Sequence, residues 1–229
     1  MKKGEHNKPV PSDLQKRAEE ILSRLERVYP DAPCFLTHRA DYQLLIAVRL
    51  SAQCTDARVN MVTRQLFVEF PTLESFANAE LARLQEAIRS CGFYVIKSRD
   101  IKQMACALLE RHGGVVPHSM EDLLALPGVG RKTANLIRGD LFGLPAIVTD
   151  THCIRIAYRT GLAETKKPEQ VERALVALIP PERSNDFCHR LVQFGRDVCK
   201  ARKPHCADCP LLDVCERRTQ SDAASCDTL

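Results

Sequence analysis

Residues 123–135 read LLALPGVGRKTAN, which places a Pro-Gly-x-Gly turn between two stretches whose apolar residues have helical spacing. Glycine tolerates positive φ and close approach of the backbone, so successive N–H groups and the positive start of the next helix can converge on one phosphate. This predicts a helix-hairpin-helix that grips a DNA backbone. The residues that would form the grip are Leu126, Gly128, Val129 and Gly130. The glycines alone are equally compatible with a tight turn between packed helices.

Helical periodicity extends along the rest of the chain. Apolar residues recur every three or four positions over residues 14–28, 81–88 and 101–108, and no convincing period-two strand is found. Predicted caps are Thr72, Asn78 and the pair Ser119 and Asp122 at helix starts, and Gly92, Gly113, Gly143 and Gly161 at helix ends. The sequence therefore predicts an all-α protein of about ten helices.

Composition narrows the class of protein further. The 229 residues are 45% hydrophobic, enough for one large core or two small ones, and the net charge of +4 allows a basic face but no polybasic tail. Eleven cysteines without a signal peptide at the start predict a reducing compartment, where metal or cluster ligation competes with simple burial. No stretch approaches the roughly 18 to 20 apolar residues of a membrane helix, so we expect a soluble protein with no membrane partner.

Two residues could carry chemistry. Lys132 is predicted in the first turn of the helix after the hairpin, where the positive helix end lowers an amine pKa and a neutral amine can attack the sugar carbon that bears a base. Asp150 lies at a predicted helix start, where it could accept a proton from Lys132 or stabilise positive charge on the sugar. The ordinary alternatives are a solvated or phosphate-binding lysine and an N-capping aspartate.

Four cysteines gather near the C-terminus, at Cys199, Cys206, Cys209 and Cys215. Four thiolates suit a [4Fe-4S] cluster or tetrahedral zinc. Zinc modules usually show two short cysteine pairs and this segment has one, which favours iron–sulfur over zinc, with four buried free thiols as the third alternative. The loop after the first cysteine is basic and is expected to contact phosphate through Lys200, Arg202 and Lys203.

Three features follow one another along the chain: the hairpin with Lys132, then Asp150, then the cysteine cluster. In this order they resemble the endonuclease III family of DNA glycosylases and AP lyases. The likeness covers nearly everything from about Leu14 to Glu216. It implies two all-α domains flanking a DNA-binding cleft. Residues 34–144 would form a six-helix domain ending in the hairpin. Residues 1–33 and 145–216 would form a domain around the [4Fe-4S] cluster, followed by a loose tail at 217–229.

The resemblance also implies roles for individual residues. Lys132 would form the Schiff base, Asp150 would be the catalytic aspartate, and the cluster would be structural and DNA-positioning. Gln53 would fill the gap left by a flipped nucleotide, and Phe93 lies where the family commonly places a leucine wedge. Otherwise Gln53 is a capping or surface glutamine, and Phe93 a core aromatic.

The resulting function is excision of oxidised pyrimidines from double-stranded DNA and β-elimination at the abasic site, by a monomer in the cytoplasm near the nucleoid if the source is prokaryotic. Val95, Ile96 and Thr149 depart from the family pattern and leave the lesion preference open, whereas Lys132 argues against the adenine-mismatch branch. Rival classes are a non-catalytic DNA-binding iron–sulfur protein, which has no need of Lys132 with Asp150, and an electron carrier, which has no need of the hairpin.

Overall fold

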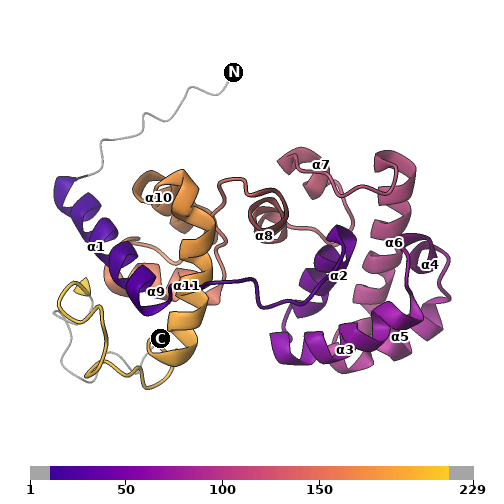
Figure 1. Ribbon diagram of the computed structural model, residues 1–229, viewed down its shortest axis with the longest axis horizontal. Coiled ribbons are helices and arrows are strands. Elements are labelled where there is room, and N and C mark those ends of the chain that lie inside the picture. Colours follow the sequence, from indigo (N-terminus) through magenta and orange to yellow (C-terminus); the bar gives the residue numbers. More distant parts are fainter. Residues whose placement is uncertain (1–10, 217–229) are drawn as a thin grey trace. The chain divides into compact units, whose positions relative to one another are not determined.

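The computed structural model describes residues 11–216, which contain eleven α-helices, two short 3₁₀-helices and no strand (Figure 1). The all-α prediction is confirmed. The described residues divide into two compact units: residues 34–144, and residues 11–33 together with 145–216. The predicted loose tail at 217–229 lies outside the described residues. Within residues 11–216, no helix combines the length and apolar character needed to cross a bilayer.

The unit of residues 34–144 holds seven α-helices, not the predicted six. They are α2 (Asp41–Ser51), α3 (Asp56–Glu69), α4 (Leu73–Ala77), α5 (Leu81–Ile88), α6 (Tyr94–His112), α7 (Met120–Leu124) and α8 (Arg131–Phe142), with the 3₁₀-helix η1 (Arg89–Cys91) between α5 and α6. Both α4 and α7 have only five residues. The count of six was implied by the family resemblance, and the structure differs from it by one short helix.

Helix α2 forms the centre of this unit and positions the hairpin. Residues 43–48 are all buried, and α2 packs against α3, α6 and α8. A helix that is apolar nearly all round has no solvent face to define, so it must be enclosed by neighbours. Arg49, in its last turn, reaches toward the hairpin that begins α8.

The second unit consists of α1 (Ser12–Val28), α9 (Thr151–Thr160), α10 (Pro168–Leu178), the 3₁₀-helix η2 (Pro181–Arg183) and α11 (Ser184–Asp197), followed by an irregular segment to residue 216. Four apolar residues of α1 are fully buried, and this helix packs against α10 and α11. They are Ala18, Ile21, Leu22 and Leu25. Their spacing of three and four residues is the period read from the sequence.

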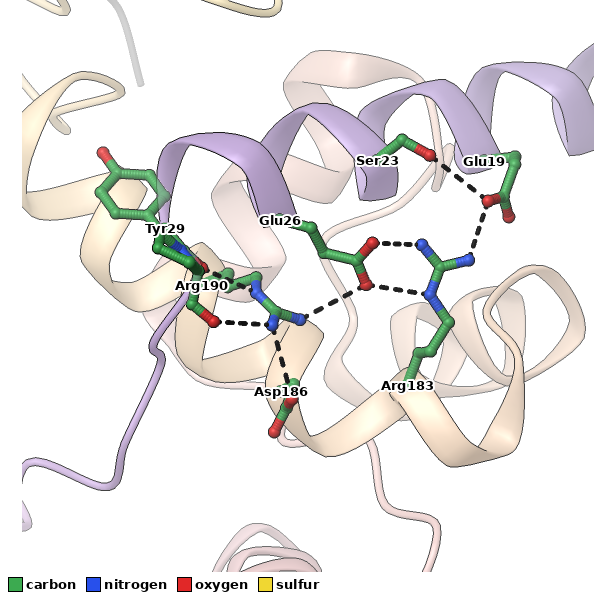
Figure 2. A network of polar contacts seen from close by, with 8 residues as sticks. Glu19, Ser23, Glu26, Tyr29, Arg183, Asp186 and Arg190 are labelled. Carbon is green, nitrogen blue, oxygen red and sulfur yellow. Dashed lines mark hydrogen bonds and ion pairs between the residues drawn. The ribbon is translucent and has the colours of Figure 1, made fainter.

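An ion-pair network joins the N-terminal helix to the late part of the chain (Figure 2). The carboxylate of Glu26 accepts hydrogen bonds from Arg183 at 2.9 and 2.5 Å, and Arg183 also binds Glu19 at 2.8 Å. Arg190 is buried and donates to the carbonyl oxygens of Tyr29 and Pro30 at 3.0 and 3.3 Å. The hydrogen bonds from Arg183 lower the pKa of Glu26. Residues at opposite ends of the sequence are thereby held in one unit.

Cap chemistry explains several helix boundaries. Thr72 forms a reciprocal capping box with Ser75, and Gly113 and Gly143 end their helices with positive φ. The prediction for Asn78 was wrong, since it ends α4 while Glu80 precedes α5. The Ser119 cap is one-sided. Its hydroxyl accepts from the N–H of Asp122 at 3.0 Å, but the Asp122 carboxylate binds that hydroxyl at 2.6 Å instead of the cap backbone.

Candidate active site and nucleic-acid interface

The predicted hairpin is present between α7 and α8. The N–H of Leu126 donates to the carbonyl of Leu123 at 3.2 Å, and the N–H of Val129 donates to the carbonyl of Leu126 at 3.2 Å. The side chains of Leu126 and Val129 are buried in the core of their unit, at 3% and 8% exposure. Their side chains therefore anchor the hairpin from below, and their predicted contribution to DNA contact is limited to the main chain.

The two hairpin glycines have different structural roles. Gly128 has φ +75°, and a methyl group there would lie 2.8 to 2.9 Å from the side chains of Arg49 and Asp100. Gly130 has φ −101° and precedes α8, and a methyl group there would meet nothing within 4 Å. Gly128 thus serves the turn and the packing beneath it. Gly130 leaves the backbone open to a ligand at the start of α8, where the N–H groups of the first turn lack helical partners.

An ion pair that the sequence did not reveal supports the hairpin from below. Arg49 of α2 pairs with one carboxylate oxygen, Oδ2, of Asp100 on α6. Its Nε donates a hydrogen bond to that oxygen at 2.7 Å, and its Nη2 lies 2.6 Å from it. The two side chains are 17% and 19% exposed. The pair therefore holds in place the two side chains that pack against Gly128. No local motif marks it, because its partners are far apart in sequence.

Lys132 is the second residue of α8 and is exposed. Within residues 11–216, no carboxylate or carbonyl group is hydrogen-bonded to its ammonium. It lies two residues after Gly130, in the first helical turn, so its amine and the open backbone belong to one short segment. This placement agrees with a reactive lysine beside a phosphate site.

Asp150 is the N-cap of α9 in the other unit. Its Oδ1 accepts a hydrogen bond from the N–H of Cys153 at 2.7 Å, and the residue is half-buried. The segment that leads to it is held by α11, because the N–H of Ala146 donates to Ser184 Oγ at 3.0 Å and the N–H of Val148 donates to Cys188 Sγ at 3.2 Å. The capping role is confirmed. It occupies Oδ1 and leaves Oδ2 as the candidate chemical group.

Three non-glycine residues within 11–216 have left-handed backbone conformation, and all three were predicted as DNA contacts. They are Gln53 (φ 55°), Phe93 (φ 48°) and Lys203 (φ 51°). Left-handed conformation in residues with a Cβ is unfavourable and concentrates at functional sites. Phe93 is 60% exposed, so the reading of a core aromatic is wrong. Gln53 is exposed as well.

The four clustered cysteines line a single cavity. Its wall is completed by apolar side chains that include Phe194, Val198 and Leu211. Burial, with a smaller contribution from the neighbouring thiols Cys199, Cys215 and Cys206, raises the pKa of Cys209 to about 11. Four sulfur ligands around one partly buried space suit a cationic group that binds them as thiolates, as an iron–sulfur cluster does. Within residues 11–216, no three His, Cys, Asp or Glu side chains converge on one point like the ligands of a single metal ion.

Two arginines of α9 hold the basic loop that begins at Cys199. Arg155 donates to the carbonyl of Cys199 at 3.1 and 2.8 Å. Arg159 is 6% exposed and donates to the carbonyls of Lys200 and Ala201 at 2.7 and 3.0 Å and to Cys199 Sγ at 3.4 Å. Helix α9 therefore presents Asp150 at its start and clamps the loop along its length. Sequence reasoning missed both arginines, although their spacing of four residues on the helix after Asp150 was a usable signal.

Arg202 and Lys203 of this loop are exposed, whereas Lys200 is half-buried. The N–H of His205 donates to the carbonyl of Val198 at 2.9 Å, which closes the loop between the first two cysteines. Of the three predicted phosphate contacts, two therefore have free access to solvent. Lys200 contributes a carbonyl to the arginine clamp and offers less of its side chain.

Comparison with known proteins covers most of the chain. Residues 46–181 match the HhH-GPD superfamily of base excision DNA repair proteins, and residues 199–215 match the iron-sulfur binding domain of endonuclease III. Endonuclease III of Bacillus subtilis is 41% identical over 208 residues, which cover 90% of this chain and 95% of that protein. The chain belongs to the endonuclease III family.

Other members of the endonuclease III family agree with this membership. The Escherichia coli K12 protein is 40% identical over 203 residues, or 89% of this chain and 96% of that one. A solved structure of a non-covalent endonuclease III–DNA complex has a TM-score of 0.86 and 41% identity, covering 90% of this chain and 99% of that chain. A trapped endonuclease III–DNA covalent intermediate gives the same TM-score. The resemblance and the [4Fe-4S] cofactor are confirmed.

Proposed function

We propose that Lys132 and Asp150 carry out the reaction of this endonuclease III family member and that its substrates are oxidised pyrimidines. Family membership makes the chain a bifunctional DNA glycosylase and AP lyase of base excision repair, with DNA as its partner. The observation that carries the residue assignment is the exposed, unpartnered ammonium of Lys132 in the first turn after the open backbone of Gly130. Exposure alone does not distinguish Lys132 from a solvated surface lysine, whereas its place in the first helical turn beside Gly130 does.

The chemistry follows from one amine and one carboxylate. Asp150 Oδ2 takes a proton from the Lys132 ammonium, and Nζ attacks the sugar carbon that bears the base. The carbon–nitrogen bond to the base breaks, and the base leaves with its electron pair and takes the proton held by Asp150. As the sugar ring opens, a proton from Nζ passes to the ring oxygen, and a Schiff base remains on Nζ. Loss of a proton from the adjacent carbon then expels the 3′ phosphate and cleaves the strand.

DNA would be gripped by parts that do not react. The main chain at Gly130 and the first turn of α8 would bind a phosphate, and Arg202 and Lys203 would bind others, without reading sequence. Gln53 and Phe93 would occupy the space left by the extruded nucleotide, which offsets part of the unstacking free energy. Their exposure and left-handed backbone support this role.

The [4Fe-4S] cluster would be held by Cys199, Cys206, Cys209 and Cys215, the four thiols that line one cavity. When bound, the cluster supplies positive iron to neutralise four thiolates and so fixes the irregular segment 198–216. The protein's own residues then present Arg202 and Lys203 from a closed loop. No step of base excision is assigned to the cluster.

Oxidised pyrimidines are the proposed lesion class because Lys132 separates this chain from the adenine-mismatch branch. Damaged bases and abasic sites in double-stranded DNA would be the substrates, and the active form would be a monomer. A panel of duplexes that each carry one thymine glycol, uracil or mismatched adenine tests the preference. Preferential release of uracil or of adenine would contradict it. Sedimentation of the holoprotein tests the monomer.

Borohydride trapping tests the residue assignment directly. The holoprotein is incubated with abasic-site duplex and reductant, and the covalent complex is quantified for wild type, Lys132→Ala and Lys16→Ala. Lys16 is an exposed lysine on α1 and is the matched control. We expect trapping by wild type and Lys16→Ala and none by Lys132→Ala. An undiminished adduct in Lys132→Ala would refute the assignment, and binding without any adduct in wild type would leave a non-catalytic DNA-binding protein.

A further inference from the structure

Lys97 is a buried cation that the reaction does not use. It lies on the first turns of α6, and its side chain is 1% exposed. Lysine is almost never fully buried unless its charge is satisfied, because removing an ammonium from water is strongly unfavourable. Burial lowers the pKa of Lys97. A group held at this energetic disadvantage needs a compensating set of partners.

The partners are three main-chain carbonyls from two separate segments. Nζ of Lys97 donates to the carbonyl oxygen of Leu50 at 2.7 Å and to that of Ala52 at 2.8 Å. It donates a third hydrogen bond, at 2.9 Å, to the carbonyl oxygen of Cys91. An ammonium has three donors, and all three are used. The amine is therefore unavailable as a nucleophile.

Both segments continue directly into the residues proposed to fill the DNA gap. Ala52 precedes Gln53, and Cys91 lies two residues before Phe93. The backbone N–H of Lys97 also donates to the carbonyl of Phe93 at 3.0 Å. Lys97 thus bonds to the main chain of the segment before Gln53 and to the main chain of the segment before Phe93.

Gln53 and Phe93 also share a backbone conformation that needs support. Their φ values of 55° and 48° fall in the left-handed region, which residues with a Cβ rarely occupy. Such conformations persist only where surrounding contacts over-determine them. The Lys97 side chain supplies such contacts to Ala52, the residue before Gln53, and to Cys91, two residues before Phe93.

We propose that Lys97 is a positioning residue for base extrusion, which sets the spacing and the left-handed conformation of Gln53 and Phe93 through its three carbonyl bonds. This inference rests on the proposed gap-filling role of those two residues. A displacement of about 1 Å in a positioning group can reduce a rate by roughly 100-fold. Lys97 would therefore affect excision strongly without touching DNA.

The test compares Lys97→Met with Lys102→Met in the holoprotein. Lys102 also lies on α6 and also donates to a carbonyl, that of Ala79 at 2.7 Å, but to a single one outside both segments. On duplex DNA with one damaged base, we expect kcat/KM to fall roughly 10- to 100-fold for Lys97→Met. Lys102→Met should stay within about threefold of wild type, because it removes one partly exposed bond. Equal losses in the two variants would overturn the proposal.

A second substrate separates positioning from chemistry and from general damage to the fold. Single-stranded DNA with an abasic site requires no extrusion, so borohydride trapping on it should be unchanged in Lys97→Met. A loss of trapping as large as the loss on duplex would overturn the proposal. Extrusion is also measured without chemistry, through the fluorescence of 2-aminopurine opposite the lesion, which should rise less in Lys97→Met than in wild type. If wild type extrudes the base but forms no covalent adduct, the assignment of Lys132 as nucleophile is contradicted, and the proposal for Lys97 still stands on the extrusion measurement.

Two further variants cover a failure of Lys97→Met to fold and test whether Lys97 acts through Phe93. If Lys97→Met does not fold, Lys97→Gln retains part of the donor set and is taken through the same substrates, with an intermediate loss on duplex expected. In the double variant Lys97→Met with Phe93→Ala, the losses should be less than multiplicative, because both act on one element. Fully multiplicative losses would show that Lys97 acts elsewhere.

Discussion

The different roles of the two hairpin glycines lead to a quantitative prediction for Gly128→Ala. At φ +75°, a residue with a Cβ is destabilised by about 1 to 2 kcal/mol. The new methyl group would also lie 2.8 to 2.9 Å from Arg49 and Asp100, and relieving such crowding costs typically 1 to 3 kcal/mol. The sum is about 2 to 5 kcal/mol, or a fall in Tm of roughly 4 to 20 °C for a chain of this size.

Gly130→Ala is the matched control, since it makes the same change two residues later. Its φ of −101° is ordinary and its surroundings are open, so only the preference for glycine over alanine at an N-cap is lost. This amounts to about 1 kcal/mol or a few degrees. The order should reverse for DNA affinity, because the Gly130 methyl group would stand on the backbone surface that a phosphate must approach.

Circular dichroism melting at a fixed scan rate measures the first effect, with cluster absorbance followed in parallel. Fluorescence anisotropy with an undamaged duplex at fixed salt, below both transitions, measures the second. In an Arg49→Ala background the Gly128→Ala penalty should shrink, because two of the three crowding atoms belong to Arg49, while Asp100 Cβ at 2.9 Å keeps part of it. Equal losses of Tm in Gly128→Ala and Gly130→Ala, or an unchanged penalty without Arg49, would refute the packing argument.

Three further predictions test the second unit. Asp150→Asn keeps an equally good N-cap, so Tm should hold while base excision falls by roughly 100-fold or more; full activity would leave only the capping role. Arg159→Met leaves the carbonyls of Lys200 and Ala201 without their donor, so cluster absorbance should decay faster and DNA affinity should drop, and an unchanged cluster would contradict the clamp. Glu26→Gln should lower the free energy of unfolding by about 1 to 2 kcal/mol at pH 7 through loss of the paired charge with Arg183. Because the folded pKa of Glu26 is lowered, this contribution is present above the unfolded value of about 4.5 and is lost as the pH falls through the folded value, so wild type and variant should converge in urea unfolding at low pH.

The sequence by itself determined the features that depend on local spacing. The all-α class follows from the helical spacing of apolar residues over segments such as 101–108. The apolar residues Ile101, Met104 and Leu108 of that segment are buried on α6, as expected. The hairpin, the placement of Lys132 in a first helical turn and the N-cap at Asp150 follow from backbone chemistry within a few residues. The cluster site was recognisable because its four cysteine ligands lie within one short segment.

Only the tertiary structure decided which of these residues share a surface and which are buried. It showed that Gly128 serves packing while Gly130 leaves the backbone open, because the atoms that crowd Gly128 belong to α2 and α6. It placed Phe93 at the surface, where a sequence pattern could not tell an exposed aromatic from a core one. It also revealed Lys97, whose carbonyl partners come from segments about Leu50 and Cys91. Spacing along a helix or turn fixes local geometry, whereas contacts between distant segments arise only once the chain has packed.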